Sequence, residues 1–92
     1  MTDGSPATAY VPTADVIARR VGQGAVLVHL PTNRIFELNA TGARIWELIV
    51  AQEDRDGIVR SLSTEFDVAP GQAREELARL VDALHREGLL EP

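Results

Sequence analysis

The fold is decided by the stretch FELNATGARIWEL, residues 36–48. Its hydrophobic period changes partway along, from that of a strand to that of a helix. Residues 34–38 are rich in aliphatic and aromatic side chains, which predicts a short strand. Asn39 is a good helix N-cap, and the apolar positions 42, 45, 46 and 49 that follow share one helical face. We therefore expect a strand that ends, and a helix that begins, at Asn39.

Two further strands are predicted before this stretch. Residues 25–30, AVLVHL, are aliphatic except for His29, and the pattern of residues 16–21, VIARRV, also predicts a strand. Glycine-rich and Pro-Asn connections of three residues join the three strands, so they should form an antiparallel meander. Residues 1–14, rich in Thr, Ser, Ala, Gly and Pro, predict a flexible N-terminal arm, which leaves residues 15–92 as the domain.

Two further helices are predicted after residue 50. Asp54 can cap the second helix, and Pro70 can begin the third. The buried set of the second helix should be Ile58, Val59, Leu62 and Phe66. The apolar stripe of the third helix should be Ala73, Leu77, Leu80, Val81 and Leu84. Gly88 stands where a left-handed C-cap belongs. Three strands followed by three helices define an α+β domain.

Composition and charge narrow the function. The net charge is −5, and all nine basic residues are arginines with acids between them, which is unfavourable for nucleic acid. The chain has no cysteine, which excludes disulfides and thiolate zinc and fits a reducing compartment. It has no apolar run of the roughly 20 residues that cross a bilayer. Its N-terminus does not resemble a signal peptide. We expect a cytoplasmic protein that does not insert into membranes.

No pattern of residues indicates catalysis. His29 and His85 have no sequence-local partner, and metal-ligand spacing such as HxxxH or HExxH is absent from the sequence. Trp46 falls on the apolar face of its helix and is expected in the core. We predict no catalytic residue, no metal, no cofactor and no enzymatic activity.

The predicted edge of the sheet is the candidate functional site. Residues 34–38 form an outer strand, whose unpaired backbone groups can accept an added strand. Ile35 and Phe36 are adjacent, so they point to opposite faces and one should leave the core. The third helix is expected to supply side-chain pockets through its small Ala78. The predicted site comprises Arg34, Ile35, Phe36, Glu37 and Leu38 on the strand, and Arg74, Leu77, Ala78, Val81, Asp82 and His85 on the helix.

The same residues resemble a known family. Leu38-Asn39, Thr41-Gly42 and Ile45-Trp46, followed by Leu48, are similar to the L-N-x-T-G-x-x-I-W-x-L signature of the PqqD family. The closing Leu84–Leu90 segment is similar to its L-x-x-x-G-L-L/I ending. The resemblance covers about residues 16–91. It implies a winged-helix-like βββααα domain, the RiPP recognition element, which binds the leader segment of ribosomally made, post-translationally modified peptides.

Within that family, the segment TNRIFELN, residues 32–39, is similar to stand-alone proteins of lasso peptide biosynthesis. The resemblance implies that the leader of a precursor peptide docks as an antiparallel strand on residues 34–38, against the third helix. A separate leader peptidase and a macrolactam synthetase would then be the partners. Ile35 and Phe36 stand where two larger aromatics are frequent, which leaves the shape of the leader pocket open. Asp54 replaces the usual Thr, which should affect only a cap.

A second functional hypothesis, DNA binding instead of peptide binding, remains open. The second and third helices are also compatible with a helix-turn-helix, so a winged-helix DNA-binding regulator is the second hypothesis. Its recognition helix would carry Glu75, Glu76, Asp82 and Glu87 beside three arginines, a poor balance for a polyanion. The sequence leaves open the oligomeric state, the leader motif, the product class and the role of Tyr10.

Overall fold

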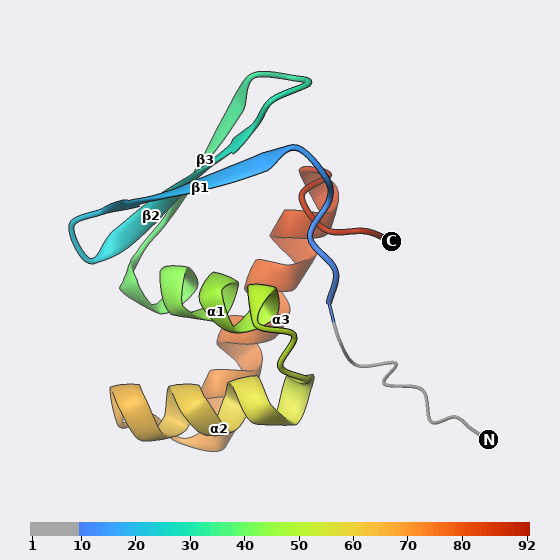
Figure 1. Ribbon diagram of the computed structural model, residues 1–92. Coiled ribbons are helices and arrows are strands. Elements are labelled where there is room, and N and C mark those ends of the chain that lie inside the picture. Colours follow the sequence, from blue (N-terminus) through green and yellow to red (C-terminus); the bar gives the residue numbers. More distant parts are fainter. Residues whose placement is uncertain (1–9) are drawn as a thin grey trace.

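A computed structural model describes residues 10–92 of the protein. The strands β1 (Val16–Val21), β2 (Gly24–His29) and β3 (Arg34–Leu38) precede the helices α1 (Ala40–Val50), α2 (Arg55–Phe66) and α3 (Pro70–Arg86). The strands form one antiparallel sheet in the order β1-β2-β3, and the helices lie on one side of it (Figure 1). The predicted α+β class is confirmed, and each element lies within a residue or two of its predicted bounds.

The register of the sheet separates a buried face from an open one. Leu27 is paired with Ala18 on β1 and with Phe36 on β3. Since side chains alternate between faces, these residues point toward the helices together with Ala25 and Leu38. Leu27 is fully buried in the core, whereas the side chains of the intervening positions point away from the helices.

The two predicted N-caps are confirmed. The Asn39 side chain accepts a hydrogen bond from the Gly42 N–H at 2.8 Å, and Asp54 accepts one from the Gly57 N–H at 2.8 Å. Each cap satisfies an amide that the first turn of a helix leaves without a backbone partner. Pro70 is the first residue of α3, as predicted.

The end of α3 is also as predicted. Gly88 has a φ of +75°, a conformation that favours glycine. Its N–H donates to the His85 carbonyl at 3.0 Å, and the Leu89 N–H donates to the Leu84 carbonyl at 2.8 Å. These two bonds define a Schellman motif, which returns the chain so that Leu89 is buried against the core.

One core prediction is wrong. Ile58, Val59 and Leu62 of α2 are buried, but Phe66 on the same stripe is 37% exposed. Phe66 is the last residue of α2, and Asp67 after it is the left-handed C-cap. The apolar stripe of α2 therefore extends beyond the hydrophobic core, and the Phe66 ring lies at the edge of the core, partly exposed to solvent. Trp46 is buried, as expected.

The N-terminal segment also differs from the prediction. Residues 11–13 are not loose, because they pair with the C-terminal segment. The Thr13 N–H donates to the Leu89 carbonyl at 2.9 Å, and the Glu91 N–H donates to the Val11 carbonyl at 2.7 Å. Tyr10 packs against the core. Backbone pairing of this kind needs no particular side chains, so composition does not reveal it; the rest of the predicted arm, residues 1–9, lies outside the described residues.

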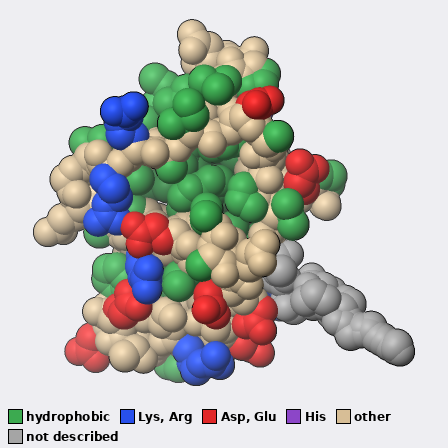
Figure 2. Space-filling view, viewed as in Figure 1, with side chains coloured by type: hydrophobic (Ala, Val, Ile, Leu, Met, Phe, Trp, Pro, Cys, Tyr) green, Lys and Arg blue, Asp and Glu red, His purple; other side chains and the backbone are tan. Residues whose placement is uncertain are grey.

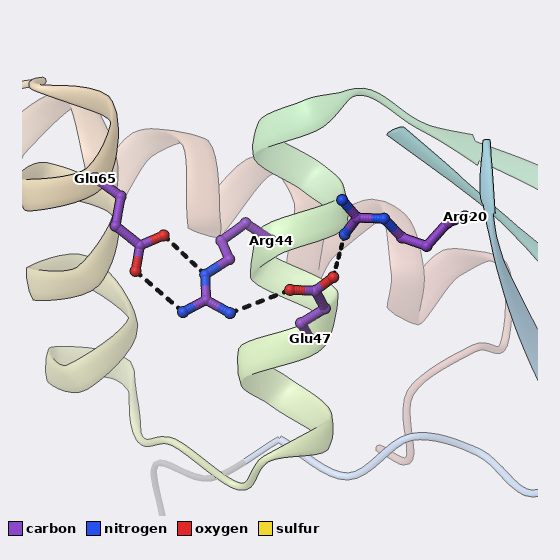
Figure 3. Close-up of polar contacts among 4 residues, drawn as sticks. All are labelled: Arg20, Arg44, Glu47 and Glu65. Atoms are coloured by element: carbon purple, nitrogen blue, oxygen red, sulfur yellow. Dashed lines mark hydrogen bonds and ion pairs between the residues drawn. The ribbon is translucent and has the colours of Figure 1, made fainter. Parts of the chain in front are cut away.

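A chain of ion pairs joins β1, α1 and α2 (Figure 3). Arg20 pairs with Glu47, which accepts from Arg44 at 3.1 Å. Arg44 also donates twice to Glu65, at 2.8 and 3.0 Å. The hydrogen bonds from Arg44 lower the pKa of Glu65, and those to Glu65 raise the pKa of Arg44. These surface ion pairs link α1 to the sheet on one side and to α2 on the other.

Candidate functional site

The free edge of β3 is the first component of the site. β3 pairs with β2 on one side, and within residues 10–92 no strand pairs with it on the other. Alternate residues of such an edge direct their N–H and C=O groups outward. The predicted split between the two adjacent apolar residues is confirmed, because Phe36 packs against the core while Ile35 is 66% exposed.

A hollow of about 250 Å³ lies where β3 meets α1 and α3. Phe36 and Leu38 of β3, Ile45 of α1 and Leu80 of α3 supply its apolar walls. Gly42 leaves little space between α1 and β3 here, since a Cβ atom at this position would lie 3.2 Å from the Leu38 side chain. The complete lining consists of Phe36, Glu37, Leu38, Asn39, Gly42, Ile45, Glu76, Arg79 and Leu80. The hollow can accept one apolar side chain of a ligand that lies along β3.

Charged residues mark both ends of this region. Glu76 and Arg79 lie at the rim of the hollow and face each other at 3.8 Å. At the other end, Arg34 of β3 reaches Glu87 after α3, with 2.7 Å between nitrogen and oxygen. From 76 to 87 a helix rises roughly 16 Å, and from 34 to 38 a strand rises roughly 13 Å. We call the strip of surface between β3 and α3 that these two pairs delimit the groove; it has the length of a peptide of about five extended residues.

The structure brings together only part of the predicted site. The five strand residues Arg34–Leu38 form the edge as expected. Leu77 of α3 is fully buried in the core, so it supports the site from below without reaching a ligand.

The rest of the predicted helix side faces away from β3, which is a correction. Arg74 lines a hollow between α3 and α2, together with Val59 and Ser63. The His85 ring nitrogen Nε2 lies 3.1 Å from the carbonyl oxygen of Glu91, beside the C-terminal segment. Both positions belong to the flank of the helix opposite to the groove.

The remaining helix positions agree with this correction. At 100° per residue, Ala78 and Val81 fall on the same flank as Arg74, whereas Leu80 falls on the groove side. Asp82 is exposed and pairs with Arg86 at 2.6 Å. The buried stripe of α3 has a flank on each side. The hydrophobic periodicity of the sequence does not indicate which of these two flanks lies beside β3. The sequence signal for the flank that lies beside β3 is Leu80, the apolar residue on the other side of the stripe from Val81.

Two further findings concern the part of the chain that the structure describes. No helix in the described part of the chain is long and apolar enough to cross a membrane. Among residues 10–92, no group of three or more His, Asp or Glu side chains is placed to hold a metal ion.

The fold and the site define an α+β domain with an open-edged three-stranded sheet and a groove beside it. The family model described as coenzyme PQQ synthesis protein D (PqqD) matches residues 24–90, and the chain belongs to this family. A solved structure described as TbiB1 in complex with the TbiA(beta) leader peptide is 30% identical and has a TM-score of 0.82. The match covers 88% of this chain and 94% of that one.

A second solved structure is described as lasso peptide synthetase B1 complexed with the leader peptide. It is 22% identical, with a TM-score of 0.82, and the match covers 90% of this chain and 98% of that one. At this identity the likeness concerns the fold. No curated protein matches the chain.

Proposed function

We propose that this protein binds the leader segment of a precursor peptide by strand addition, in the biosynthesis of a lasso peptide. The observation that carries the proposal is the groove itself, a β3 edge that no strand of residues 10–92 pairs with, next to an apolar hollow. Main-chain hydrogen bonds to β3 supply affinity, and the hollow selects a side chain at one position of the leader. The structural relative at 30% identity was solved with a leader peptide, which supports this assignment.

The helix side of the proposed site is Glu76, Arg79, Leu80 and Glu87, in place of the flank named from the sequence. Leu80 contacts the apolar anchor of the leader in the hollow. Glu76 and Arg79 contact charged or polar leader side chains at the rim. Arg34 and Glu87 close the opposite end, where the leader leaves the groove.

In this proposal the protein itself catalyses no step. It holds the leader for separate partner enzymes, a leader peptidase and a macrolactam synthetase, and raises the local concentration of the precursor at their active sites. We place this step in the cytoplasm, where ribosomes produce the precursor.

The test is a titration of the isotope-labelled protein with a leader peptide, followed by amide NMR. The two outer strands of one sheet provide a matched comparison, since both expose an edge. We expect the amides of β3 and of residues 76–80 to shift and to exchange more slowly with solvent, while those of β1 change little. Changes confined to β1, or no binding, would refute the proposal.

A further inference from the structure

The face of the sheet that points away from the helices is largely apolar. Ile17 of β1 is paired with Val28 of β2, and Val28 with Ile35 of β3, so the three side chains form one row across this face. Ile17 is 46% exposed, Ile35 is 66% exposed, and Val21 on the same face is 57% exposed. Figure 2 shows hydrophobic side chains over the sheet and in the region between the sheet and the helices, while carboxylates gather mainly over the helices and arginines lie over both. Exposed apolar faces of this kind are common where a protein contacts another molecule.

This face carries one positive and one negative side chain, at equivalent positions on either side of β2. Arg19 of β1 is paired with Val26, and Val26 is paired with Glu37 of β3, in the row next to the apolar one. Both charged residues are exposed. Two inter-strand spacings put their backbones roughly 10 Å apart. Among residues 10–92 neither side chain forms a salt bridge with a neighbour.

From this arrangement we propose that the outer face of the sheet binds a second copy of this chain. A two-fold axis that runs along β2, between two stacked sheets, places β1 of one copy over β3 of the other. Arg19 then faces Glu37 of the partner subunit, and the same contact occurs a second time by symmetry. The two Val26 side chains stack between the ion pairs, and the apolar rows stack beside them, at the distance of about 10 Å that is usual for packed sheets. A surface with one arginine and one glutamate at opposite ends of a single row is complementary to itself, which favours a second copy over an unrelated partner.

This contact uses a face of the sheet, whereas the leader is proposed to pair with its edge. The groove opens toward α3, on the other side of the sheet from Ile17 and Val28. A dimer can therefore present two open β3 edges, and the inference does not depend on leader binding.

The experiment is sedimentation of the full chain across a range of concentrations, with two charge-reversal variants. R19E puts two glutamates on the face, and E37R puts two arginines there. In a homodimer of either variant, both ion pairs become repulsive contacts, so each should dimerise about tenfold more weakly than the wild type. An equimolar mixture of R19E and E37R restores both attractive pairs, as does the double variant R19E/E37R, and both should dimerise as the wild type does. R60E on α2 makes the same charge change away from the sheet and should leave dimerisation unchanged.

Each result decides the question. Dimerisation that is lost in the single variants and regained on mixing would establish this interface. A wild type that stays monomeric at every concentration would overturn the proposal, and so would single variants that fail to associate with each other. A dimer that R60E weakens as much as R19E would place the contact on another surface and overturn it as well. Thermal melting of each variant checks that the fold is intact, which is expected because both positions are exposed.

Discussion

Leu80 and Val81 allow a sharp test of which flank of α3 faces the ligand. They are adjacent, aliphatic and partly buried, but Leu80 lines the hollow beside β3, while Val81 falls on the other flank of the helix, which it shares with Arg74. Leu80→Ala removes three carbon atoms from the wall of the hollow. At about 0.8 kcal/mol per buried methylene, with half of this contact made to the ligand, binding weakens by about 1–1.5 kcal/mol. This corresponds to a roughly tenfold higher Kd for the leader.

Val81→Ala is the matched control. It removes apolar atoms from the next residue of the same helix, so it should lower stability by a similar amount while the Kd changes by less than about twofold. Leu80→Met keeps the volume of the side chain and should bind within about threefold of the wild type. The assay is fluorescence anisotropy of a labelled leader peptide, with thermal melts of each variant. Equal loss of affinity in Leu80→Ala and Val81→Ala would show that our placement of the ligand is wrong.

Two predictions concern stability. In a denaturant titration, Gly24→Ala should lower the free energy of unfolding by about 1–3 kcal/mol, because the new Cβ would overlap the Leu38 carbonyl oxygen. The control is Gly71→Ala, where no atom lies within 4 Å of the new Cβ. This variant should be neutral or slightly stabilising in the same titration. Arg44 lowers the pKa of Glu65 below its usual 4.5, so their contact stabilises the fold above that pH and is lost as the pH falls through the lowered pKa. Arg44→Gln should therefore destabilise by less than about 1 kcal/mol at neutral pH, with the difference vanishing in acid; a difference that grows toward acid would contradict this reasoning.

Local features of the fold were predictable because they depend on neighbouring residues. The caps at Asn39 and Asp54, the start at Pro70 and the turn at Gly88 each follow from the side chain or φ angle that one position requires. The open edge was predictable as well, since three strands with short connections can only form a meander with two free edges. The exposure of Phe66 was not predictable, because the apolar stripe of α2 does not indicate where the hydrophobic core ends.

By itself, then, the sequence determined the six elements, the α+β class, the free β3 edge and the family signature around Asn39. Only the tertiary structure decided which flank of α3 lines the groove and that residues 11–13 close against the C-terminal segment. The physical reason is that periodicity defines the centre of a buried stripe but treats its two flanks alike. The choice between Leu80 and Val81 is made by how α3 packs across α1 and α2, through contacts between residues far apart in the chain.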